Sequence, residues 1–249
     1  MTTSRPGAAG AHEAVDLDRL LASGDLDIGV FTSEELALLV ADTHLDLYPG
    51  DGPVLGAGAR SLIARGYAAS SANDRLTFGG ELSLVAHARS KSSCVASLVG
   101  RFGDNRGVAI VYVIEGGVAL EERIEAPGIH AFKLRKAARA VSDLARAVSA
   151  DRLVEVAAER TVTCDPADET FDPVTALVGA PASVASLEVV RRDAADHLRI
   201  TKALPIRDQL GASWLAQARP AERAWFARQM STHDAEALLT ALMLEPLPA

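Results

Sequence analysis

Two glycines, Gly56 and Gly58, stand where a phosphate-binding loop could lead into a helix. Backbone N–H groups at such a helix start can bind phosphate. A dinucleotide site needs a preceding apolar strand and a third glycine. Here a Pro/Gly turn precedes the pair, and Ser61 occupies the third-glycine position. A P-loop would need Gly-Lys-Ser/Thr, and no lysine is near. The pattern indicates a flexible loop leading into a helix, and we expect no cofactor and no small-molecule ligand.

Two acidic clusters could suggest a metal ion. Asp42 and Asp46 would share one face of a helix while His44 lies roughly opposite, so the three cannot close on one ion. A second run lacks the spacing and central glycine of an EF-hand loop. It indicates a solvated loop, with weak cation binding as the alternative. Its members are Asp165, Asp168, Glu169 and Asp172.

Nucleophile signatures are missing from the sequence. There is no G-x-S-x-G elbow, and Cys94 and Cys164 have neither a CxxC partner nor a histidine nearby in the sequence. The histidines form no HExxH or HxH pair; they are His12, His44, His87, His130, His197 and His233. We therefore expect a protein that is not an enzyme and holds no metal.

Arginines in residues 59–82 allow a different hypothesis. The stretch "ARSLIARGY" followed by "NDRLTF" resembles the last helix and wing of a winged-helix protein, which would present Arg60 and Arg65 to DNA. Arg75 and Arg89 would extend this positive face. The chain as a whole carries a formal net charge of −8, which disfavours nucleic acid. A DNA-binding regulator remains the alternative reading.

Composition indicates a soluble globular protein. The 249 residues are 49% hydrophobic and 23% charged. No run approaches the roughly 18 apolar residues of a membrane span, and residues 1–14, predicted to be disordered, have no apolar core of a signal peptide. We expect a cytoplasmic protein. The preference for alanine, and for arginine over lysine, suggests a GC-rich genome such as that of an actinobacterium.

Hydrophobic periodicity predicts an α+β chain. In the first half, Thr32 and Glu35 form a helix-start signal, and Val/Ile/Leu-rich runs separated by glycine turns predict an antiparallel meander. The predicted helices are a short one at 15–22 and those at 34–46, 59–65, 80–88 and 134–148. The predicted strands are 94–102, 108–115 and 118–125. After residue 151 the predicted strands are 154–164, 184–191 and 197–202. The predicted helices there are 171–178, one opened by Arg219-Pro220, and 235–244.

An internal echo suggests duplication. "VASL" occurs at 95–98 and again at 184–187, each time after a small helical segment and before a polar turn and another strand. The sequence therefore predicts a single α+β domain over 15–249, built from pseudo-repeats at about 30–149 and 151–249.

The layout resembles the EspG family, cytosolic chaperones of ESX (type VII) secretion. The resemblance lies in "FTSEELALL", "LIARGY", "NDRLTFGGELSLVAHA" and the meander "VASLVGRFGDNRGVAIVYVIEGGVALEE", and it covers about residues 30–149. The predicted ending departs from the family, because two helices around 214–244 replace a strand-rich C-terminus.

The resemblance implies a central antiparallel sheet with flanking helices and pseudo-two-fold halves. It also implies binding without chemistry. The partner would be a PE/PPE-like or other helical secreted protein, whose apolar tip is covered before export. Such a role needs an exposed groove or sheet face. The resemblance assigns no individual partner-binding residue.

Overall fold

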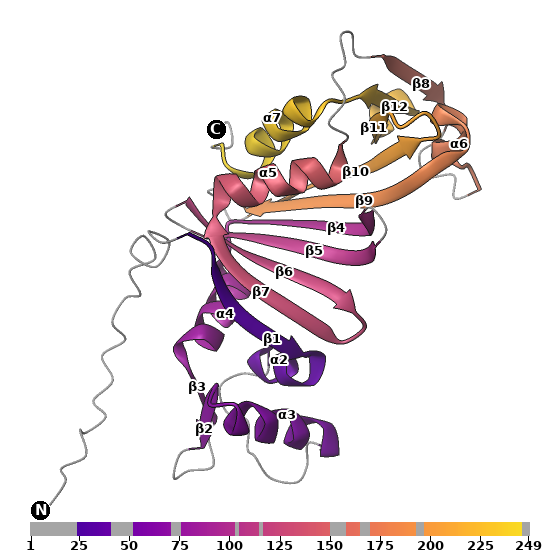
Figure 1. Cartoon of the computed structure of the whole chain (residues 1–249). Coiled ribbons are helices and arrows are strands. Elements are labelled where there is room, and N and C mark those ends of the chain that lie inside the picture. Colours follow the sequence, from indigo (N-terminus) through magenta and orange to yellow (C-terminus); the bar gives the residue numbers. More distant parts are fainter. Residues whose placement is uncertain are drawn as a thin grey trace, which may run out of the picture.

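A single antiparallel sheet organises the chain (Figure 1). The structure is a computed structural model that describes residues 24–40, 52–70, 76–102, 105–114, 117–149, 158–164, 170–192 and 197–245. Ten strands pair in the order β1-β7-β6-β5-β4-β9-β10-β11-β12-β8, and a separate two-stranded sheet pairs β2 with β3. The predicted α+β class and central antiparallel sheet are confirmed.

The first half contributes five strands of the large sheet and the helices α2 to α5. Its elements are β1 (Leu26–Thr32), α2 (Ser33–Val40), α3 (Gly52–Ala64), β2 (Ala68–Ser70), β3 (Leu76–Phe78), α4 (Gly80–Lys91), β4 (Cys94–Phe102), β5 (Asn105–Ile114), β6 (Val118–Ala126), β7 (Ile129–Lys136) and α5 (Ala137–Val148).

The second half supplies the other five strands. Its elements are β8 (Glu159–Thr163), α6 (Pro173–Val178), β9 (Pro181–Arg192), β10 (Leu198–Asp208), β11 (Ser213–Arg219), the 3-10 turn η2 (Pro220–Glu222), β12 (Ala224–Gln229) and α7 (Thr232–Met243). The halves meet where β4 pairs with β9.

Side-chain alternation assigns each face of the sheet to different helices. On β4, Cys94, Ala96 and Leu98 point into a core beneath α5 and α7, whereas Val95 packs into a core formed with α2, α3 and α4. Alternate residues of a strand face opposite ways, so α5 and α7 cover one face and α2 to α4 cover part of the other (Figure 1). A smaller core under α6 contains Trp214.

Four strands of the large sheet, β1, β7, β11 and β12, were not predicted. The expected helix 134–148 is confirmed as α5, except that its first three residues belong to β7. The helix expected to begin at Arg219-Pro220 was wrong. Arg219-Pro220 opens only η2, between β11 and β12. The second half therefore has the strand-rich ending that the sequence reading denied it, and α7 alone is helical there, as predicted for 235–244.

The glycine pair lies inside α3, so the expected loop before that helix is also wrong. Gly58 is buried where α3 meets α2: a Cβ on Gly58 would come within 2.8 Å of the Glu34 carbonyl oxygen. Its lack of a side chain allows this close approach. Beyond the described residues lie 1–14, the short helix predicted at 15–22, and the trio Asp42, His44 and Asp46.

Candidate binding face of the sheet

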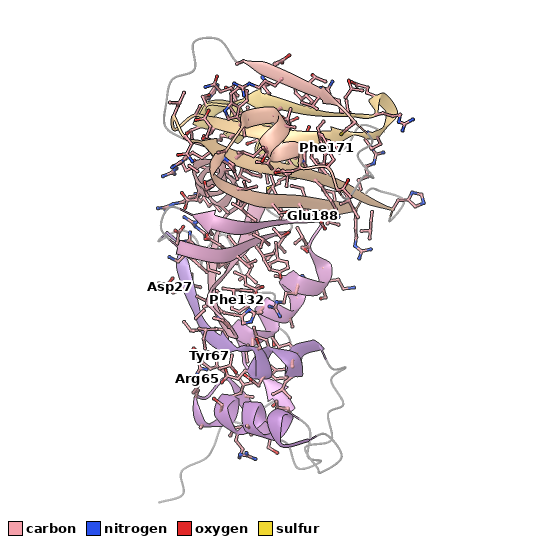
Figure 2. The ribbon with its side chains drawn as sticks, turned by 90° about the vertical axis from the view of Figure 1, so that its right-hand side faces the viewer. Asp27, Arg65, Tyr67, Phe132, Phe171 and Glu188 are labelled. Carbon is pink, nitrogen blue, oxygen red and sulfur yellow. The ribbon has the colours of Figure 1, made fainter. Side chains whose placement is uncertain are left out.

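The face of the sheet that carries α2 to α4 is only partly covered. Helices α2, α3 and α4 pack over β5 and β6 at one end, and α6 packs over β10, β11 and β12 at the other. Between them the ends of β4, β5, β6 and β9 form an open hollow of about 690 Å³. In Figure 2, Glu188 of β9 lies on the sheet between the N-terminal helices and the α6 region.

Apolar side chains and glycines dominate this hollow, which we call the sheet groove. Val99 on β4 is 48% exposed and Val184 on β9 is 36% exposed. Val108 is paired directly with Val99 and also with Ile124, so the three form a continuous apolar row across three strands. Among the described residues, the lining consists of Val99, Gly100, Gly107, Val108, Ile124, Ala126, Pro127, Ala182, Ser183 and Val184.

Gly100, which lines the sheet groove, allows a close approach between β4 and β9. Its φ is +157°, and a Cβ there would lie 2.6 Å from the Ala185 Cβ. Only glycine lets β4 and β9 approach this closely. The β4 and β9 backbones therefore lie close together beside Val99, where the apolar row ends on β4.

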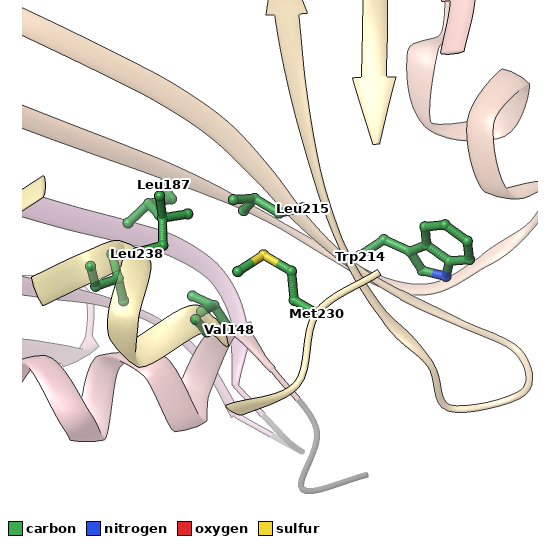
Figure 3. A pocket seen from close by; sticks show the side chains of 8 residues that line it. Val148, Leu187, Trp214, Leu215, Met230 and Leu238 are labelled. Atoms are coloured by element: carbon green, nitrogen blue, oxygen red, sulfur yellow. The ribbon is translucent and has the colours of Figure 1, made fainter. Parts of the chain in front are cut away.

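Other hollows differ in character. On the opposite face, a hollow of about 450 Å³ is lined mostly by ion-paired groups, among them Arg135, which contacts Asp25, Glu121 and Asp143. A third, between α7 and the sheet, has room for about one water molecule, at about 10 Å³, and is lined by apolar side chains (Figure 3). It is a packing gap in the core.

Arg65, which could have faced DNA, is bound within the molecule. Its Nη1 donates to both carboxylate oxygens of Glu35 at 2.9 Å, and its Nη2 donates to the Val30 carbonyl at 2.6 Å. The guanidinium also lies 5.2 Å from the Phe31 ring centroid and 4.9 Å from that of Tyr67. The "LIARGY" stretch therefore fastens α3 onto β1 and α2.

Glu35 is the buried centre of this arrangement. Only 1% of it is exposed. Burial acts to raise its pKa, but hydrogen bonds from Ser61, from the Thr32 N–H and from Arg65 outweigh burial and hold the pKa below its ordinary value. The Thr32–Glu35 capping box predicted from the sequence is present, because Glu35 N–H donates to Thr32 Oγ1 while Thr32 N–H donates to Glu35 Oε2.

A second buried carboxylate, Glu122, collects three donors from three elements. Arg89 of α4 lies 2.6 Å from Oε1, the Tyr112 hydroxyl donates to Oε2 at 2.9 Å, and His130 Nδ1 lies 2.6 Å from Oε1. Burial, and then the charge of Glu122, raise the pKa of Tyr112. These contacts bind α4 to the meander.

Ser33, His130 and Glu122 follow the hydrogen-bond order of a catalytic triad, with Ser33 Oγ 3.0 Å from His130 Nε2. Arg89 offsets the carboxylate charge that would stabilise an imidazolium. The Ser33 N–H is also committed to the Gly128 carbonyl, so it does not serve as an oxyanion donor. We interpret the chain of contacts as a tie between α2 and β7.

The DNA-binding alternative loses two of its four arginines. Arg65 and Arg89 are paired with buried carboxylates, Arg60 is exposed on α3, and Arg75 lies outside the described residues. The helix and two short strands expected of a winged helix are present as α3, β2 and β3. Of the three of these arginines that the structure describes, two are therefore paired with carboxylates inside the fold and one is exposed.

The remaining site candidates are structural where they can be placed. Asp172 is the N-cap of α6, and hydrogen bonds from Thr175 and Val174 lower its pKa; the other acidic residues of that run lie outside the described residues. Cys94 is a buried free thiol whose pKa burial raises to about 11. Within the described ranges, His, Cys, Asp and Glu form no group that could hold a metal ion, and no helix there is long and apolar enough to cross a membrane.

Comparison with known proteins finds a shared fold and no sequence relative. No family model matches the chain, and no curated protein matches significantly. The fold is shared with a secretion chaperone. A solved structure of the Mycobacterium tuberculosis type VII secretion system chaperone EspG5, in complex with the PE25–PPE41 dimer, superposes with a TM-score of 0.50 at 12% identity. The match covers 90% of this chain and 97% of that one.

This likeness confirms the EspG-like fold implied by the sequence resemblance. It extends across both halves, whereas the sequence resemblance covered only about 30–149. The sequence alone predicted no individual binding residue. The exposed valines of the sheet groove could have been noticed only as members of the strands "VASLVG" and "PASVASL", where nothing in the letters separates them from buried neighbours.

Proposed function

We propose that this protein is an EspG-like chaperone or adaptor that binds a helical protein partner in the cytoplasm before export. The sheet groove is the observation that carries the proposal. It is an exposed apolar surface on a fold shared with a chaperone whose solved complex holds a PE–PPE dimer. Exposed apolar patches on soluble proteins commonly mark protein interaction sites.

The partner would be a PE/PPE-like or other helical secreted protein, and the function requires no catalysis and no cofactor. An apolar groove fits the apolar face or tip of a helix. The internal pairing of Arg65 and Arg89 supports this reading over DNA binding.

We further propose that residues 30–149 and 151–249 are pseudo-repeats within one domain. Counted outward from the centre of the sheet, the strands are β4, β5, β6, β7, β1 on one side and β9, β10, β11, β12, β8 on the other. Each half has a helix directly before its central strand, α4 or α6, and a helix at its end, α5 or α7. The same order of elements in both halves supports duplication.

The test is an affinity pull-down from the native host at low salt, comparing the wild type with Val99→Glu. Val30→Glu is the matched control, because Val30 is 50% exposed on β1 and lies outside the sheet groove. We expect a helical secreted protein that Val99→Glu loses and Val30→Glu keeps. Recovery of DNA alone, or equal recovery by both variants, would contradict the proposal.

A further inference from the structure

Equivalent positions in the two halves of the open face carry opposite chemistry. Leu98 pairs with Leu187 across β4 and β9. One residue further along β4 is Val99, whose partner on β5 is Val108. One residue further along β9 is Glu188, whose partner on β10 is Lys202. The apolar pair of the first half thus occupies the place that an ion pair occupies in the second.

The four side chains point to the same face of the sheet. Ser97 of β4 pairs with Glu188, and residues directly opposite in a sheet share a face. Ser97 and Val99 alternate in phase with Val95, which packs against α2 to α4. Both pairs therefore lie on the partly covered face, with Glu188 visible there in Figure 2.

Stability does not require the ion pair. Lys202 Nζ lies 3.1 Å from Glu188 Oε2, and the side chains are 72% and 37% exposed. Pairs this exposed contribute little to folding. Covering them with an apolar partner would instead remove two charges from water at a large desolvation cost. The pair therefore acts against an apolar occupant of the second half.

The size of the sheet groove fits one occupant. One turn of an α-helix with its side chains is a cylinder about 10–12 Å wide and 5.4 Å high, or about 420–610 Å³. The hollow of about 690 Å³ accommodates about one such turn. The lining residues that the structure describes include no charged side chain, so an uncharged helix end fits it.

We infer that the open face takes a single apolar helix end, seated over Val99 and Val108, and that the Glu188–Lys202 pair excludes a second one from the equivalent position. The pseudo-repeated sheet would otherwise offer two such positions. This inference rests on the proposed function, and it makes Glu188 and Lys202 determinants of where the partner binds and in which orientation.

The test measures apolar binding positions on the free protein with the dye bis-ANS. The double variant Glu188→Val/Lys202→Val creates a second Val/Val pair, and we expect about twice as much bound dye at saturation. The charge swap Glu188→Lys/Lys202→Glu keeps an ion pair and should bind as the wild type does. Val99→Ser/Val108→Ser should lose most of the bound dye. Far-UV circular dichroism and thermal unfolding would verify that every variant is folded.

Two results would overturn the inference: no added dye on the folded Val/Val variant, or wild-type dye binding that the serine variant leaves unchanged. The dye needs no biological partner, so the outcome is separate from the pull-down. A failed pull-down together with the expected dye pattern would refute the chaperone role and leave the one-sided face intact. A successful pull-down without the added dye on the Val/Val variant would refute only the proposal that Glu188 and Lys202 exclude a second occupant.

Discussion

Leu98 lies directly opposite Leu187 at the centre of the ten-stranded sheet, where β4 pairs with β9. Both side chains are buried beneath α5 and α7, within one cluster that draws residues from both halves of the chain. Because this core crosses the boundary between the proposed pseudo-repeats, we expect the two halves to unfold together.

Leu98→Ala and Leu187→Ala should each lower the free energy of unfolding by about 2–5 kcal/mol, since each leaves a cavity in a packed core. Both tryptophans, Trp214 and Trp225, lie in the second half. We nevertheless expect Leu98→Ala to shift the urea midpoint seen by tryptophan fluorescence as far as the midpoint seen by far-UV circular dichroism. Separate midpoints would show that the halves unfold as independent units.

Glu35→Gln should destabilise the protein by about 2–3 kcal/mol, because it removes the charge that the Arg65 guanidinium contacts at two oxygens. The matched control is Glu222→Gln, which removes the exposed Arg219–Glu222 pair and should cost less than about 0.5 kcal/mol. Urea unfolding at neutral pH measures both. Equal losses would mean that Glu35 contributes no more than a surface charge.

The stability supplied by Glu35 should disappear in acid. Its folded-state pKa lies below the ordinary value, so the unfolded chain binds the proton more readily. The contribution is therefore complete above the unfolded pKa of about 4.3 and is lost as the pH falls through the folded value. The difference in unfolding free energy between wild type and Glu35→Gln should therefore shrink as the pH falls below about 4.3. A pH-independent difference would contradict this account.

Gly58→Ala and Gly56→Ala should have opposite effects, although both glycines lie in α3. Alanine favours a helix over glycine by about 1 kcal/mol. At position 58 the added methyl group meets the Glu34 backbone at 2.8 Å, whereas at position 56 it meets only the flexible Arg60 side chain, at 3.4 Å. We expect Gly58→Ala to lower the melting temperature and Gly56→Ala to raise it slightly. A rise for both would show that α2 and α3 separate at little cost.

The sequence predicted the strands, turns and helix caps that depend on residues close together in the chain. The Val/Ile/Leu-rich runs between glycine turns became β4, β5 and β6, and the Thr32–Glu35 capping box was found as predicted. These features depend on neighbours within a few residues. The final helix, α7, begins with its own capping box between Ser231 and Asp234.

Features that depend on contacts between residues far apart in the sequence could not be predicted from it. The β1 sequence "LDIGVFT" is short and contains a glycine, so its pattern does not predict a strand. It is a strand because it pairs with β7. The Arg219-Pro220 sequence matches a helix start, but β11 and β12 pair across it and leave only a short turn. The sheet groove could not be predicted either, because Val99 is exposed only where neither α2 to α4 nor α6 covers the sheet.

The pairing of β1 with β7 has a consequence for synthesis on the ribosome. Phe31 of β1 pairs with His130 of β7, although α2, α3, α4, the small sheet of β2 and β3, and three strands of the large sheet are made in between. During synthesis, β1 therefore has no strand to pair with until β7 has left the exit tunnel. The meander of β4 to β6 is local and can form earlier. We expect β1 to join the sheet late, as the edge strand of a meander that has already formed.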